Sequence, residues 1–227
     1  MDDPRSFASD SSMPAQATAL HPEPTRRYLA LGDSYTIGEG VDEAGRWPAQ
    51  LARALRSEGL AIDEPEIIAR TGWTTDELIA AVDAQAPSPD YGLVSLLIGV
   101  NDQYRGRSPE EYARHFESLL RRAAGLARGR PERVLVLSIP DWGVTPFGNA
   151  DARGAERIGA QIDALNALAH DACRRHGVTW IDITAASRAH GAEPAMLVAD
   201  GLHPSAAMYA LWTRLALPAA RAMAAAP

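Results

Sequence analysis

A serine and a histidine, Ser34 and His203, are candidates for a nucleophile and its general base. Ser34 follows an apolar run that ends at Gly32. A turn at this point would present the Ser34 hydroxyl at a sheet edge and its backbone N–H at a helix N-terminus. Both features suit a nucleophile whose attack creates an oxyanion. The alternative is that Asp33 or Ser34 only caps the helix that follows.

His203 has an acid three residues before it, Asp200, and a proline directly after it, Pro204. The proline keeps the histidine out of helical geometry, so this short loop can present both side chains to one cleft. The Asp200 carboxylate can then reach Nδ1 and leave Nε2 facing a serine, as a general base requires. A solvated Asp–His pair is the alternative, and Asp182 is a competing acid from another loop.

Two further segments could supply hydrogen-bond donors to an oxyanion. Asn101 follows an apolar run, and Gly99 just before it permits close backbone approach. The Asn101 amide can donate to a developing negative charge, and so can the backbone N–H of Gly72. The alternatives are an ordinary turn at Gly72 and a helix cap at Asn101.

Short apolar runs alternate with amphipathic stretches from residue 26 onward, which predicts a parallel α/β sheet covered on both faces. We expect strands at 28–31, 66–69, 93–98, 134–139 and 178–183, and helices at 47–58, 75–84, from 108 onward, at 153–176 and at 205–223. The carboxyl ends of parallel strands share one edge, so the four segments described above should converge there. Residues 26–227 are expected to form a single domain, and residues 1–25 a flexible tail.

Composition and charge exclude several classes of protein. The net charge of −7 and the absence of a basic stripe argue against a nucleic-acid partner. No apolar run is long enough to cross a bilayer, and the acidic N-terminus lacks the order of a secretory signal, so we expect a cytoplasmic protein. The single cysteine, Cys173, has no partner for a disulfide or a metal motif. No Gly-x-Ser-x-Gly, Gly-x-Gly-x-x-Gly or Walker motif follows the first strand.

Taken together, the four segments resemble the SGNH (GDSL-like) hydrolase family. They read Gly32-Asp33-Ser34, Gly72, Gly99-Val100-Asn101-Asp102 and Asp200-Gly201-Leu202-His203-Pro204, in the family's order. The resemblance implies a flavodoxin-like, three-layer α/β/α fold with strand order 2-1-3-4-5. It also implies a serine ester hydrolase without metal or cofactor. Ser34, His203 and Asp200 would be its catalytic residues, and Ser34, Gly72 and Asn101 its oxyanion hole.

Aromatic residues near the strand ends could wall an acyl or sugar pocket, although packing over the strand ends would explain them equally well. These residues are Tyr35, Trp73, Tyr104, Trp142 and Phe147. Tyr35 replaces the leucine of the family's name-giving motif, which would reshape the pocket. We expect a small, soluble short-chain ester as substrate. A catalytically silent carbohydrate-binding module, an acyltransferase and a carbohydrate deacetylase are alternatives, and the sequence leaves the oligomeric state open.

Overall fold

Five parallel strands form one sheet in the order β2-β1-β3-β4-β5, which confirms the order that the resemblance implied. The structure, a computed structural model, describes residues 26–225, so the tail predicted at residues 1–25 lies outside the described residues. The strands are β1 (Tyr28–Gly32), β2 (Glu66–Ala69), β3 (Leu93–Leu97), β4 (Val134–Leu137) and β5 (Thr179–Ile181).

The three central strands are buried along their whole length, whereas the edge strands β2 and β5 are only partly buried. This difference follows from the sequence, because β1, β3 and β4 are almost continuously apolar, as expected for strands covered on both faces. Adjacent strands pair in parallel register, with Leu31 opposite Leu96 and Leu96 opposite Val136. The core therefore extends along the middle of the sheet.

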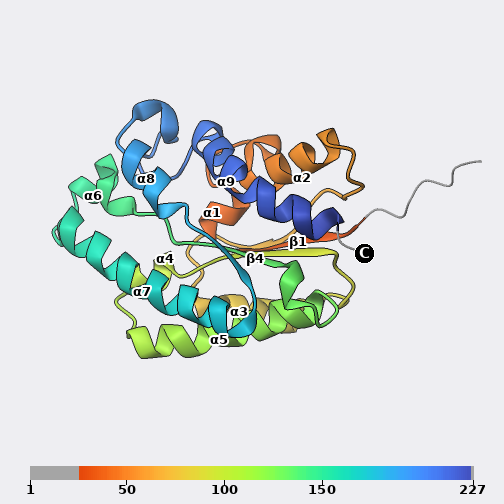
Figure 1. Ribbon diagram of the computed structural model, residues 1–227. Helices are drawn as coiled ribbons and strands as arrows, with labels where there is room; N and C mark the ends of the chain where they lie inside the picture. Colours follow the sequence, from red (N-terminus) through yellow and green to blue (C-terminus); the bar gives the residue numbers. More distant parts are fainter. Residues whose placement is uncertain (1–25, 226–227) are drawn as a thin grey trace, which may run out of the picture.

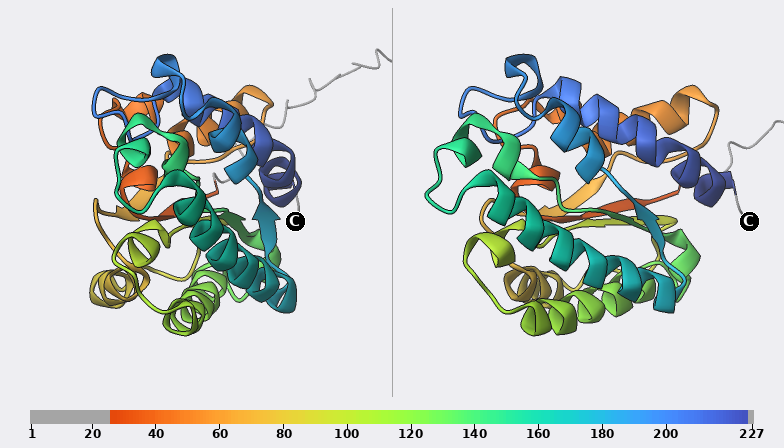
Figure 2. Two further views of the ribbon diagram at one scale, coloured as in Figure 1. Left: turned by 90° about the vertical axis from the view of Figure 1, so that its left-hand side faces the viewer. Right: turned by 60° about the vertical axis from the view of Figure 1, so that its left-hand side comes forward.

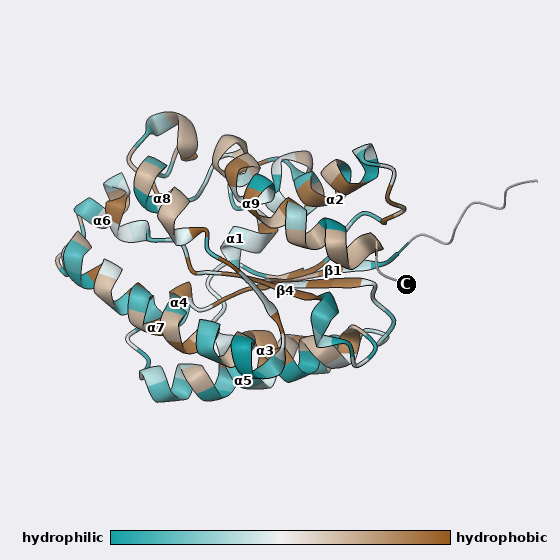
Figure 3. Cartoon of the chain, viewed as in Figure 1, coloured by the Kyte–Doolittle hydropathy of each residue, from teal (hydrophilic) through white to brown (hydrophobic). Residues whose placement is uncertain are grey.

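Helices cover both faces of the sheet and complete the three layers (Figure 1). The helices α2 (Trp47–Ser57) and α9 (Ala206–Ala225) pack together on one face. On the other face lie α3 (Thr75–Gln85), α5 (Pro109–Leu126) and α7 (Ala155–His176). Both views of Figure 2 keep these two layers on opposite sides of the sheet. In Figure 3 the strands are largely brown and the outer turns of α5 are teal, as amphipathic helices over an apolar sheet require.

Local signals in the sequence fix the start and end of the long helices. Ser108 caps α5 by accepting a hydrogen bond from the backbone N–H of Glu111 at 3.1 Å, and Pro109 occupies the first turn. Helix α7 ends at Gly177, whose φ of 67° is readily adopted by glycine. Cys173 is fully buried in this helix.

Four short helices lie on the side where the strands end; the sequence predicted the helix N-terminus at Ser34 but gave bounds for none of the four. They are α1 (Ser34–Ile37), α4 (Val100–Tyr104), α6 (Pro146–Asn149) and α8 (Thr184–His190). Each is too short for hydrophobic periodicity to show. Strands β4 and β5 are also shorter than predicted. Beyond them, the Ser138 hydroxyl accepts hydrogen bonds from the backbone N–H groups of Ile183 and Thr184 at 2.8 and 3.0 Å, so side-chain contacts replace the strand ladder there.

Candidate active site

The four predicted segments converge on one cavity of about 210 Å³ at the carboxyl ends of the strands. The cavity lies near the boundary between β1 and β3, where the strand order reverses and open α/β sheets usually bind ligands. Its lining contains Ser34, Tyr35, Thr71, Gly72, Val100, Asn101, Tyr104, Trp142, Phe147, Leu202 and His203. Thr71, Val100 and Leu202 were not singled out in the sequence, because neither an isolated hydroxyl nor an aliphatic side chain signals chemistry.

Ser34 is the first residue of α1, directly after β1. The preceding residue, Asp33, caps the helix through Oδ1, which accepts the backbone N–H of Tyr35 at 3.0 Å. The cap is therefore supplied by Asp33, and Ser34 lines the cavity. The tight turn into the helix depends on Gly32, since a Cβ at this position would come within 2.2 Å of Thr36 Oγ1.

The Asp33 carboxyl group is fully buried beside Ser34. Within residues 26–225, its second oxygen, Oδ2, has no hydrogen-bond partner. The pKa of Asp33 is raised to about 8: burial raises it most, the hydrogen bond from Tyr35 N–H opposes the shift, and the nearby charge of Asp102 adds to it. Asp33 is therefore mainly protonated in the folded protein at neutral pH.

Asp200 and His203 form a closed pair in the loop before α9. The distance between His203 Nδ1 and Asp200 Oδ2 is 2.6 Å, and Asp200 Oδ1 accepts the backbone N–H groups of Leu202 and His203 at 2.8 and 2.9 Å. Burial acts to raise the pKa of Asp200, but the hydrogen bonds from His203 and Leu202 outweigh it, and the pKa lies below its ordinary value. An ionised Asp200 thus faces Nδ1 of the histidine.

The competing acid, Asp182, is engaged elsewhere. Its Oδ1 accepts the backbone N–H of Thr184 at 2.8 Å and the hydroxyl of Ser138 at 3.2 Å. It lines a separate depression beside α7 and α8. The geometry therefore pairs His203 with Asp200.

Gly72 and Asn101 reach the cavity from two adjoining segments. Gly72 has a φ of 85°, which favours glycine. The side-chain amide of Asn101 donates one hydrogen bond to the backbone carbonyl of Trp73 at 2.9 Å. An amide has two N–H donors, so the second remains for a ligand in the cavity. Gly99, with a φ of 125°, lies just before α4, where a Cβ would approach Tyr112 to 2.6 Å.

Three aromatic side chains form one wall of the cavity. Trp142 is buried, while Tyr104 and Phe147 are 48% and 42% exposed at the mouth. The Trp142 ring lies 5.6 Å from that of Tyr104 and 6.0 Å from that of Phe147. The guanidinium group of Arg153 stacks over both Tyr104 and Trp142.

The other two predicted pocket aromatics differ from each other. Tyr35 lines the cavity, with its ring centroid 5.9 Å from that of His203. Trp73 is not among the lining residues. Its side chain is partly buried against the core, and its backbone carbonyl accepts from Asn101. The position of the tryptophan in the chain could not reveal this, because the direction of a side chain after a glycine turn has no sequence signature.

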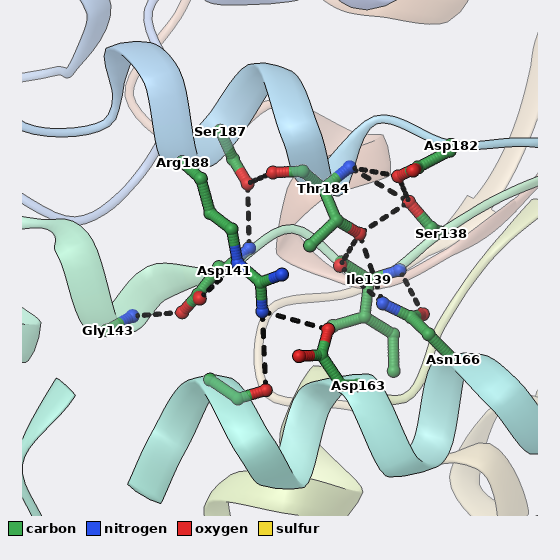
Figure 4. A network of polar contacts seen from close by, with 11 residues as sticks. Ser138, Ile139, Asp141, Gly143, Asp163, Asn166, Asp182, Thr184, Ser187 and Arg188 are labelled. Carbon is green, nitrogen blue, oxygen red and sulfur yellow. Dashed lines mark hydrogen bonds and ion pairs between the residues drawn. The ribbon is translucent and has the colours of Figure 1, made fainter. Parts of the chain in front are cut away.

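A network of hydrogen bonds and ion pairs connects Asp141, the residue before Trp142, to α8 (Figure 4). The backbone N–H of Asp141 donates to Ser187 Oγ at 2.8 Å, and its Oδ2 accepts from Arg188 Nε at 2.8 Å. Arg188 also donates to Asp163 of α7 at 2.9 Å. These contacts fix the segment that carries Trp142 between two helices.

The remaining described histidines lie outside the cavity. Two of them have carboxylate partners: His176 lies 2.9 Å from Glu117, and His190 lies 2.8 Å from Glu193. His190 is the last residue of α8. Within residues 26–225, no cluster of three or more His, Cys, Asp or Glu side chains could hold a metal ion. In the same part of the chain, no helix is long and apolar enough to span a membrane.

Comparisons with known proteins agree with this geometry. The family model described as GDSL-like lipase/acylhydrolase matches residues 30–211. No curated protein matches the chain significantly. Among solved structures, TesA has a TM-score of 0.69 at 22% identity, covering 87% of this chain and 99% of its own. A lipase/acylhydrolase from Enterococcus faecalis has a TM-score of 0.66 at 22% identity, covering 87% and 96%.

A third structure is Axe2, an acetylxylan esterase from Geobacillus stearothermophilus. Its TM-score is 0.63 at 21% identity, with 86% of this chain and 94% of that chain covered. At such identities the three structures establish a shared fold. The family match is independent of them and spans most of the chain.

Proposed function

Because the chain belongs to the GDSL-like lipase/acylhydrolase family, we propose that it is a serine-dependent carboxylic ester hydrolase. Ser34 is the nucleophile, His203 the general base and Asp200 its orienting acid. The observation that carries the proposal is the 2.6 Å contact between Asp200 and His203, with His203 and Ser34 lining the same cavity. A binding module would need no such pair beside a serine.

In the first half of the reaction, His203 Nε2 takes the proton of the Ser34 hydroxyl as Oγ attacks the ester carbonyl carbon. Asp200 accepts the Nδ1–H bond and stabilises the imidazolium. Three donors meet the oxyanion of the tetrahedral intermediate: the backbone N–H groups of Ser34 and Gly72 and the free amide N–H of Asn101. Ser34 begins α1, so its N–H has no intrahelical acceptor.

In the second half, His203 gives its proton to the departing alcohol, and the acyl group stays on Ser34 Oγ. Water then enters, loses a proton to His203 and attacks the acyl carbon. Collapse of the second tetrahedral intermediate releases the carboxylic acid and returns the proton to Ser34. The cycle needs no metal or cofactor.

The cavity supports a small and neutral acyl group. Its volume of about 210 Å³ lies below the roughly 300–1,000 Å³ of sites for drug-sized ligands. Among the described residues, the lining includes one imidazole, that of His203, and no Arg or Lys, and most of the remaining surface is aromatic or aliphatic. Such a lining has no cation to hold a charged acyl chain. Short-chain, soluble esters are therefore the substrates that we propose.

Hydrolysis of p-nitrophenyl esters from acetate to palmitate, by the wild type and by Ser34→Ala, tests the proposal. We expect the wild type to cleave the short members and Ser34→Ala to lose that activity. Ser57→Ala is the matched control, because Ser57 lies at the end of α2 and its hydroxyl bonds to the carbonyl of Ala54. Equal activity of the wild type and Ser34→Ala would refute the role of Ser34.

A further inference from the structure

Helix α4 and the loop before α3 are joined by contacts that hold the two candidate oxyanion donors together. Asn101 lies on α4, and Gly72 lies in the loop. The Asn101 amide bonds to the Trp73 carbonyl at 2.9 Å. Asp102 accepts the backbone N–H and the hydroxyl of Thr75 at 3.0 and 2.7 Å. The loop is therefore fixed to α4 on the side that follows Gly72.

Arg105, the residue that ends α4, adds a contact at Gly72 itself. Its Nη2 donates to the carbonyl oxygen of Gly72 at 2.5 Å, and its Nη1 lies 3.4 Å from Glu77 Oε1. A Cβ built on Gly72 would lie 3.7 Å from the same Nη2, so the guanidinium group lies against the glycine. The arginine does not line the cavity.

We propose that Arg105 is a positioning residue of the oxyanion hole, holding Gly72 so that its backbone N–H points at the developing oxyanion. The inference rests on the proposed ester hydrolysis. The hydroxyl of Thr71 donates to Glu39, and the backbone N–H of Trp73 donates to the carbonyl of Arg70 at 3.2 Å. Arg105 adds a side-chain donor to the carbonyl of Gly72 itself. Holding the carbonyl of Gly72 anchors the peptide that follows its Cα. The preceding peptide, which carries the Gly72 N–H, is joined to the same Cα and therefore has less freedom to move.

The charge of Arg105 supports the same step. The guanidinium group is permanently cationic, and it lies next to the peptide that meets the oxyanion. A preorganised donor lowers the barrier only if it is already aimed at the position where charge develops. Arg105 therefore acts on the tetrahedral intermediate and hardly on the bound ester.

Arg105→Met tests the proposal, because methionine keeps an unbranched apolar stem and removes the donors and the charge. We expect kcat for p-nitrophenyl butyrate to fall between about 10- and 100-fold, since removing a donor outright costs about 10²–10³ and a displaced one costs less. KM should stay within about 2-fold, because only the transition state loses an interaction. Arg105→Lys, which keeps one donor and the charge, should recover part of kcat.

Arg107→Met is the matched control. Arg107 also follows α4, but it pairs with Asp76 and Glu111 and makes no contact with Gly72. It should keep the kcat of the wild type even if its melting temperature falls. A short-chain trifluoromethyl ketone, whose adduct with Ser34 carries an oxyanion, provides a second measurement. Its inhibition constant should weaken in Arg105→Met by the same factor as kcat/KM and stay unchanged in Arg107→Met.

Two results would overturn the proposal. One is a kcat of Arg105→Met equal to that of Arg107→Met. The other is a loss in Arg105→Met that appears in KM alone, with the inhibitor bound as tightly as before. Failure of the proposed function is distinguishable from both, since it would appear first as a wild type that cleaves no ester or as an active Ser34→Ala.

Discussion

Replacing Asp33 by Asn tests whether the carboxyl group beside Ser34 is protonated in the folded protein. Asn keeps an oxygen that can accept the N–H of Tyr35, so the cap on α1 survives. Asn cannot ionise, however, so the difference in stability between the variant and the wild type measures the cost of burying the charged Asp33 carboxylate. We expect Asp33→Asn to gain stability over the wild type as the pH rises.

The sign and size follow from the pKa of Asp33, which burial raises from 3.8 to about 8. Between these values the folded chain keeps a proton that the unfolded chain has lost. Stability from this group is complete below the unfolded pKa and declines as pH rises toward the folded one. Between pH 5 and pH 7 the slope lies close to the limit of about 1.4 kcal/mol per pH unit for a single site.

Urea unfolding, followed by tryptophan fluorescence, at pH 5, 6 and 7 measures this effect. The difference in unfolding free energy between Asp33→Asn and the wild type should grow by about 2–3 kcal/mol from pH 5 to pH 7. Because the two proteins share every other titrating group, the difference isolates Asp33. A difference that does not change with pH would mean that Asp33 ionises normally and would refute the reasoning.

Three further predictions concern the residues around the cavity. Asp200→Asn should lower kcat by up to about 10⁴-fold, the size of the loss seen when the acid of a Ser-His-Asp triad is replaced. The loss should persist from pH 5 to pH 8, because the pKa of Asp200 lies below its ordinary value. Asp182→Asn is the control that should keep kcat. Gly72→Ala places a Cβ at a φ of 85° with no steric clash. The free energy of unfolding in urea should therefore fall by about 1–2 kcal/mol, the cost of a left-handed conformation for alanine, and a larger fall would imply a contact that the structure lacks. Arg188→Met leaves the buried Asp141 carboxylate without its cation and should lower the free energy of unfolding by about 1–2 kcal/mol. In the double variant with Asp141→Asn the two losses should be less than additive, and strict additivity would contradict the pairing.

Much of the fold could be predicted from the sequence because its signals are local. Continuous apolar runs identified the five strands, and Ser108 with Pro109 identified the start of α5. Parallel strands end at one edge, so the convergence of Ser34, Gly72 and Asn101 followed from the order of the elements. The strand order itself came from the family resemblance, since alternation alone is compatible with other orders.

The details that fix the site could not be read in the same way. Arg105 contacts Gly72 across 33 positions, and Arg188 contacts Asp141 across 47. Neither spacing has a repeat or a motif, because such contacts arise only after the helices pack. The pKa shift of Asp33 has the same origin, as it depends on complete burial in the folded chain. Trp73 likewise turned toward the core, which no local pattern signals.

The most direct test of the central claim is to trap the acyl-enzyme. The protein is mixed with p-nitrophenyl acetate, quenched in acid within milliseconds to seconds, digested and mapped by mass spectrometry. We expect an acetyl group on the peptide that contains Ser34, absent from Ser34→Ala and present in Ser57→Ala. Acetylation of any other residue during turnover, or hydrolysis by Ser34→Ala at the rate of the wild type, would contradict this expectation.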